Sequence, residues 1–115
     1  MSIESRIVTA VTPIIPEVAA GRYDGDALEY ITFNRNGWGM LYADSEPRAV
    51  YSLVQVHYYC PHKQNPRETL EQLAEAIFSA GFAFPSVTDA SDEDGQHYVL
   101  ETSDAEGREN GTVHH

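Results

Sequence analysis

Cysteine is nearly absent from this sequence. Cys60 is the single thiol among 115 residues, so no disulfide can form within one chain and nothing indicates an oxidising compartment. The first fifteen residues include charged side chains, which argues against a signal peptide, and no stretch reaches the roughly 18 apolar residues of a membrane span. These absences predict a cytosolic protein with no membrane partner.

Basic residues are also scarce. Seven Lys and Arg stand against 18 Asp and Glu, which gives a formal net charge of -11 and a pI near 4.6. A field of this sign repels phosphate backbones, so sequence-specific binding to nucleic acid is not expected. Negative charge also keeps a protein soluble and discourages random association, which is the simpler explanation of the composition.

Recognised motifs for catalysis and cofactor binding are missing as well. There is no Gly-x-Ser-x-Gly elbow, and the segment 37–39 (GWG) lacks the third glycine and the following helix of a phosphate-binding loop. His57, Cys60 and His62 are residue types that bind zinc. On a strand, however, His57 and Cys60 point to opposite faces, and no further Cys or His pair completes four ligands. We therefore expect no enzyme activity, no metal and no cofactor.

An acidic segment near the C-terminus partly matches a calcium-binding loop. Asp92, Asp94, Gly95 and Glu101 have the spacing of four positions in that template. The first position of the template is Ala90 instead of an aspartate, and the flanking residues favour strands over helices. An acidic hairpin turn is the better interpretation.

Two helices are predicted from apolar residues at helical spacing. Residues 1–12 form the first, with Ser2 as its cap and Pro13 as its stop. Residues 65–80 form the second, and its signals are Asn65 as cap, Pro66 at the first helical position, Glu68 in a capping box and Gly81 as stop. Its apolar stripe comprises Leu70, Leu73, Ala74, Ile77 and Phe78.

Strands are predicted in two groups. Residues 28–60 are expected to form three strands (28–34, 38–43 and 50–60), with Asn36-Gly37 as a hairpin turn. In the third strand, Val50, Ser52, Val54, Val56, Tyr58 and Cys60 share one face. Residues 83–102 are expected to form a second hairpin, with strands at 83–88 and 96–102 and a turn at Asp94-Gly95. Residues 13–27 remain as a long loop and 103–115 as a flexible tail.

The predicted order is helix, three strands, helix, two strands, which indicates a single α+β domain with an antiparallel or mixed sheet and both helices packed on it. Aromatic residues are frequent in the predicted strands: Trp38, Tyr42, Tyr51, Tyr58 and Tyr59. They are equally typical of interfaces and of small cores. Because two helices are too few to cover both faces of such a sheet, the pattern favours an oligomer.

The segment from Glu29 to Glu101 resembles small minor tail proteins of siphophages and prophages, in the tail-terminator (tail-completion) family. The matching stretches are two strands (EYITFNRN and VYSLVQVHYYCP), a helix (NPRETLEQLAEAIFSAGF) and a hairpin (DASDEDGQHYVLE). They cover about two thirds of the chain in the same element order. The shared motifs are structural and include no catalytic residues.

The resemblance implies a subunit of a ring, typically a hexamer, at the head-proximal end of the tail tube. Such a protein is assembled in the bacterial cytoplasm, becomes part of the virion tail, and has further copies, the tail tube and head–tail connector proteins as partners. Acidic residues lining the ring would repel DNA that passes through it. The alternatives for this lining are Asp92, Glu93 and Asp94 or the loop with Asp24 and Asp26, and the candidate interface residues are Trp38, Tyr51 and Tyr59.

Two other functions stay open at this point. A monomeric acidic binding module would inhibit a host protein or mimic nucleic acid, as the net charge of -11 allows. A small metal-dependent enzyme would depend on His57, Cys60 and His62.

Overall fold

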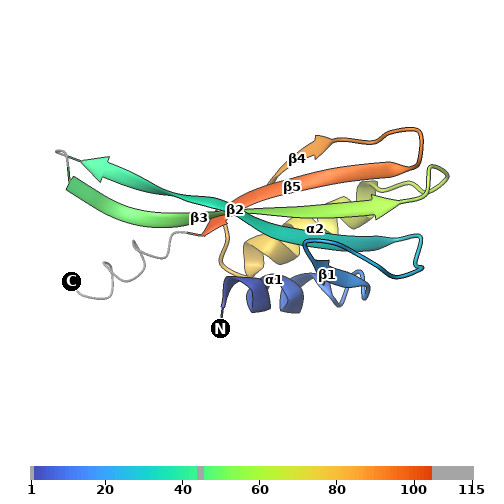
Figure 1. Cartoon of the computed structure of the whole chain (residues 1–115), viewed down its shortest axis with the longest axis horizontal. Coiled ribbons are helices and arrows are strands. Elements are labelled where there is room, and N and C mark those ends of the chain that lie inside the picture. Colours follow the sequence, from blue (N-terminus) through green and yellow to red (C-terminus); the bar gives the residue numbers. More distant parts are fainter. Residues whose placement is uncertain (1, 44–45, 105–115) are drawn as a thin grey trace.

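The computed structural model describes residues 2–43 and 46–104, and along 36–43 and 46–51 it describes the backbone alone. The elements are α1 (Ile3–Val11), β1 (Val18–Ala20), β2 (Tyr30–Ala43), β3 (Glu46–Cys60), α2 (Arg67–Ser79), β4 (Ser86–Asp89) and β5 (Gln96–Asp104) (Figure 1). The strands form one sheet in the order β1-β2-β3-β5-β4, parallel between β1 and β2 and antiparallel elsewhere. The predicted α+β class and element order are confirmed.

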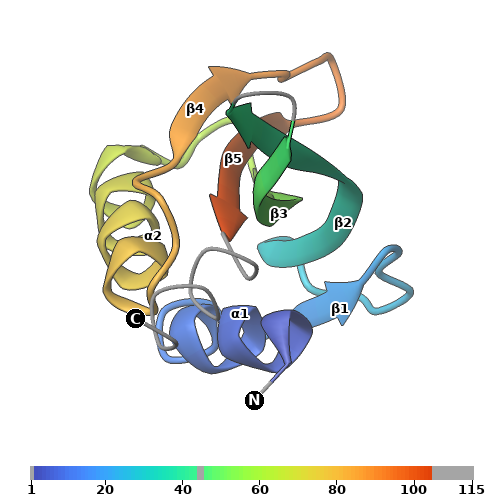
Figure 2. The ribbon, with the colours of Figure 1, turned by 90° about the vertical axis from the view of Figure 1, so that its left-hand side faces the viewer.

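Both helices lie on the same face of the sheet (Figure 2). The core fills the space between the helices and the sheet. It comprises Ile3, Ile7, Val11, Ile15, Ile31, Phe33, Val54, Val56, Tyr58, Cys60, Leu73, Ala74, Ile77, Phe82 and Leu100. From Ser52 to Cys60, alternate β3 residues are buried, as the period of two predicts. No helix within residues 2–43 and 46–104 is long and apolar enough to cross a membrane.

Helix α1 is joined to the end of α2 and to the end of β5 through one arginine. Its Ser2 cap accepts a hydrogen bond from the Ser5 amide at 3.1 Å, as predicted. The Arg6 guanidinium donates to the Ala80 carbonyl at 2.9 Å, and its Nη1 lies 3.1 Å from Asp104 Oδ2 as an ion pair. The guanidinium also lies 4.3 Å from the centre of the Phe82 ring. One side chain therefore connects α1, the end of α2 and the end of β5.

Helix α2 begins one residue later than its sequence signals predict. Pro66 is the cap residue itself, and because its ring has no hydrogen-bonding atom, the expected capping box with Glu68 does not form. The Asn65 side chain still accepts a hydrogen bond, from the Arg67 amide at 3.1 Å. Gly81 ends the helix with a φ of 100°, as expected. Phe78, predicted to be buried, is 53% exposed because it lies at the edge of the stripe.

The predicted hairpin turn at Asn36-Gly37 is wrong. Strand β2 continues through these residues, which form a bulge: Arg35 pairs with Val54 and Trp38 with Ser52, so two residues of β2 face one of β3. The strands predicted at 28–34 and 38–43 are therefore one strand, and its hairpin with β3 closes beyond Ala43. Glycine within a strand marks bulges as well as turns, which explains the misreading.

The loop predicted at 13–27 contains a strand. β1 is three residues long and pairs with Ile31–Phe33 of β2. Three residues are too few for a periodic signal, so the sequence did not reveal it. The total of five strands agrees with the prediction because this gain offsets the merging of the two strands in β2.

The second hairpin is confirmed with changed limits. β4 is shorter than the predicted strand 83–88. β5 is longer than the predicted strand 96–102, because it continues to Asp104, into the predicted tail. The rest of that tail lies outside the described residues. Asp92 and Gly95 pair with each other, so Glu93 and Asp94 form the centre of the turn in place of the expected Asp94-Gly95.

Candidate functional site

The acidic residues predicted to line a ring gather at one end of the molecule. The connection between β1 and β2 carries Asp24 and Asp26, and the turn between β4 and β5 carries Asp92, Glu93 and Asp94. Both segments lie at the end of the long axis opposite the tip of the β2–β3 hairpin (Figure 1). All five side chains are exposed. The fold thus unites the two alternatives, and we call this region the acidic end.

Hydrogen bonds hold the β4–β5 turn in shape. The Asp89 carboxylate accepts from the Ser91 amide and the Asp92 carboxylate from the Asp94 amide, each at 2.9 Å. The hydrogen bonds from Ser91 lower the pKa of Asp89. The turn therefore presents its negative charges to solvent from an ordered backbone.

An aromatic ladder lies beside the acidic end, on the sheet face opposite the helices. It is formed by neighbouring rings from the β1–β2 connection and from three strands, stacked except for the tilted pair of histidines: Tyr23, Tyr30, Tyr59, His97 and His57. The Tyr59 ring stacks 4.6 Å from Tyr30 and 4.2 Å from His97. Tyr59, a predicted interface residue, is half-buried in this ladder. Flat rings across an uncovered sheet face are typical of protein contact surfaces.

Two ring nitrogens meet at the edge of the ladder. His57 Nδ1 lies 2.8 Å from His97 Nε2, so one ring donates a hydrogen bond to the other. Burial lowers the pKa of both rings; the charge of His97 lowers that of His57 further, whereas Asp92 and Asp89 act against the lowering at His97. Burial and the mutual repulsion of two positive rings therefore both disfavour charging the pair.

The zinc cluster considered from the sequence is not assembled. Cys60 lies on the buried face of β3 and His57 on the opposite face. His62 follows the strand and lies 3.1 Å from the Glu93 carbonyl. Within the described part of the chain, no group of three or more His, Cys, Asp or Glu is placed to hold a metal ion.

Sequence reasoning missed a partly buried polar cluster that connects β3, β5 and the segments before β2 and after β3. The Tyr58 hydroxyl donates to the Glu29 carboxylate, and Gln64 donates to the same oxygen at 2.5 Å. Burial and the bond to Glu29 raise the pKa of Tyr58. Gln96 in turn donates to the Gln64 carbonyl at 2.6 Å. The only sequence signal was a hydroxyl on the apolar face of a strand, which needs a buried partner.

At the opposite end, β2 and β3 project as a two-stranded arm, which we define as residues 36–43 and 46–51. Strand β5 ends at Asp104 opposite Ser52, and β1 ends at Ala20 opposite Phe33, so no other described strand accompanies the arm (Figure 1). At its base, Arg35 donates to the Ser52 hydroxyl at 2.7 Å. The predicted interface residues Trp38 and Tyr51 belong to the arm by their backbone positions.

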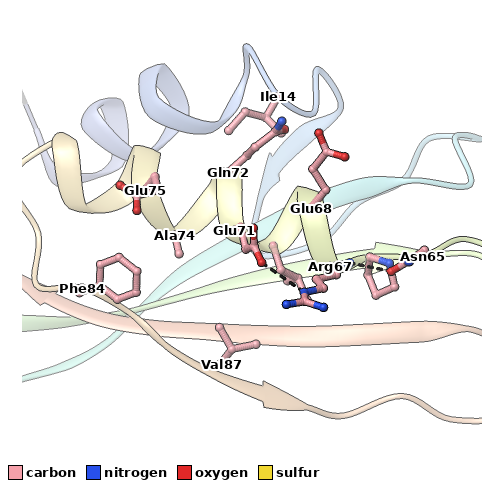
Figure 3. Close-up of a pocket in the computed structure, with 12 residues that line it drawn as sticks. Ile14, Asn65, Arg67, Glu68, Glu71, Gln72, Ala74, Glu75, Phe84 and Val87 are labelled. Carbon is pink, nitrogen blue, oxygen red and sulfur yellow. Dashed lines mark hydrogen bonds and ion pairs between the residues drawn. The ribbon is translucent and has the colours of Figure 1, made fainter.

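A groove of about 1120 Å³ runs between α2 and β4 (Figure 3). Ile14, Leu70, Ala74, Phe84 and Val87 supply its apolar lining, and Glu68, Glu71 and Glu75 its acidic rim. Phe84 is 57% and Val87 47% exposed. An ion pair of 3.3 Å between Arg67 and Glu71 lies at one end. The sequence did not predict the groove, although the run 82–84 (FAF) places one phenylalanine inside and one outside.

No protein-family model matches the sequence, and no curated protein matches it either. The placement of the chain's own residues therefore carries the functional proposal.

Proposed function

We propose that this chain is a virion structural protein: a minor tail component that forms a ring at the head-proximal end of a phage or prophage tail tube, ends the growth of the tube and joins the tail to the head. The observation that carries the proposal is the polarity of the molecule. One end bears an arm that no other described strand accompanies, and the other bears clustered carboxylates. A ring subunit needs both a contact with its neighbour and a surface that lines the channel through which DNA passes.

The arm supports self-association. A two-stranded hairpin by itself is marginally stable in water, and a third strand or a packed face is what stabilises it. A contact between the arm of one copy and a different surface of the next joins unlike surfaces, and such contacts close into rings when the rotation between copies allows. The resemblance to tail-terminator proteins makes six the expected number of copies.

The acidic end supports a lining for passing DNA. Asp24, Asp26, Asp92, Glu93 and Asp94 are exposed and lie away from the arm. If the arms connect the outer parts of the ring, the acidic ends face inward, and their field repels phosphates. DNA then passes without sticking, which is a structural role that needs no catalytic residue, cofactor or specific base contact.

The first test is the solution mass of the protein by light scattering, over a concentration series and with purified tail tubes added. A discrete oligomer near six chain masses of 12.8 kDa, or a ring at the ends of tubes in electron micrographs, supports the proposal. A chain that stays monomeric and ignores tubes contradicts it.

The acidic end also favours a second candidate, a monomeric binding module that competes with nucleic acid for a basic protein. The same samples separate the two functions. A stable monomer that displaces DNA from a basic host protein supports the binding module, whereas a ring that leaves such complexes intact supports the tail protein.

A further inference from the structure

The arm is built to be covered by something outside its own chain. Its strand 36–43 (NGWGMLYA) has no charged residue, and 46–51 (EPRAVY) has one of each sign, in a protein with a net charge of -11. It extends beyond both helices and β4, so it cannot reach the groove of its own copy without separating β2 from the sheet (Figure 1). Aromatic surface without net charge in this position has the properties of a segment that inserts into a partner.

The groove offers a surface with matching properties. β4 is the last strand of the sheet, all four of its residues are exposed, and its outer backbone groups have no strand beside them in the described part of the chain. An open edge beside an apolar groove is the arrangement that accepts an added strand. The exposed ring of Phe78 lies 5.7 Å from the Phe84 ring and extends the apolar surface beyond the lining of the groove.

Size and charge select the arm as the occupant. Its eight-residue strand is about 26 Å long at roughly 3.3 Å per residue, and β4 has only four residues. One arm is therefore long enough to pair along the whole of β4. The acidic rim repels the rest of another copy, which is itself acidic, but it does not repel an arm without net charge.

We propose that the arm of each copy lies in the groove between α2 and β4 of the next copy and pairs with the open edge of β4. The contact joins two different surfaces, so it can repeat from copy to copy and forms a ring when the rotation between copies closes. This inference rests on the proposed function, since it names the interface by which the ring subunits hold one another.

Cysteine cross-linking tests the contact directly. Cys60 stays in place, because it is only 3% exposed and burial raises the pKa of its thiol. We expect Met40→Cys and Val87→Cys, mixed as separate chains and treated with a short bismaleimide, to give covalent dimers, and the double variant to give a ladder up to the ring size. Thr88→Cys is the matched control, because it neighbours Val87 but points to the opposite face of the sheet. Equal yields at 87 and 88 would overturn the proposal.

A second measurement does not depend on the register of the arm. Val87→Asp places a carboxylate in the groove, and we expect it to weaken assembly at least about tenfold, since the buried charge has no partner. Val8→Asp, at a similarly exposed valine of α1, should leave assembly unchanged. If the wild type forms rings and Val87→Asp forms them equally well, the arm contact is wrong and the ring proposal stands. If the wild type never assembles, both fail.

Discussion

The two ends of the β2–β3 hairpin differ although the same two strands run through both. Between Ser52 and Cys60, β3 has a strand on each side and helices over one face, and its alternate residues are buried. Between Glu46 and Tyr51 it pairs with β2 alone among the described strands. One continuous strand can therefore be well packed along one part and have few contacts along another. The body has its own buried core, whereas the arm has no third strand beside it in the described part of the chain.

The largest expected effect is at the boundary between these regions, where the body sheet ends at Asp104. Asp104→Ala leaves Arg6 without its carboxylate, and because the Asp104 side chain is only 6% exposed, we expect a loss of about 3 kcal/mol in the free energy of unfolding. Urea unfolding measures it. Arg6→Met combined with Asp104→Leu should recover part of the loss, since no unpaired charge remains. Equal losses in both variants would contradict a role for the ion pair.

A matched pair of valines on β3 compares the regions directly. Val56 is fully buried, so Val56→Ala should cost about 2 to 3 kcal/mol in unfolding free energy. Val50 lies six residues along the same strand, beyond the last residue of β5, and Val50→Ala should cost less than about 0.5 kcal/mol in the monomer. Thermal unfolding of dilute protein checks both. Similar losses of unfolding free energy in the two variants would show that the arm unfolds together with the rest of the sheet as one cooperative unit.

The smallest expected effect is a pH dependence confined to the ladder. The pKa values of His57 and His97 are lower in the folded protein than in the unfolded chain, so near pH 6.5 the unfolded chain binds protons that the folded protein does not. Stability therefore falls as pH drops through about 6.5 and stops falling below the folded pKa values. His57→Gln with His97→Gln should flatten this slope in urea unfolding between pH 8 and 5. The exposed His62→Gln is the control, and an unchanged slope in the double variant would contradict the assignment.

The sequence predicted what depends on local pattern. The Ser2 cap of α1, most of the apolar stripe of α2 and the alternation from Ser52 to Cys60 follow from spacing, and the structure agrees, whereas the predicted capping box of α2 does not form. The mistakes concern features that depend on distant partners. Asn36-Gly37 is a turn signal in isolation, yet pairing with β3 on both sides turns it into a bulge. β1 exists only because β2 offers an edge beside it.

The candidate site was predictable only in part. The acidic residues were named from composition, but their meeting at one end required the order of the strands. The groove depends on how α2 and β4, which are separate in sequence, lie against each other. Phe78 shows why spacing alone is not enough. Its helical spacing places it in the apolar stripe, yet its ring lies at the surface beside that of Phe84.

The position of β5 between β3 and β4 also sets an order of events during synthesis. β4 is made before β5, yet its hydrogen-bonded neighbour in the sheet is β5, so it has no place until the last strand has left the ribosome. The ion pair of Arg6 forms later still, because its partner Asp104 is the final residue of β5. A chain that ends before β5 would lack both the strand that holds β4 and the fully buried Leu100 of the core, so it could not complete the sheet edge that borders the groove.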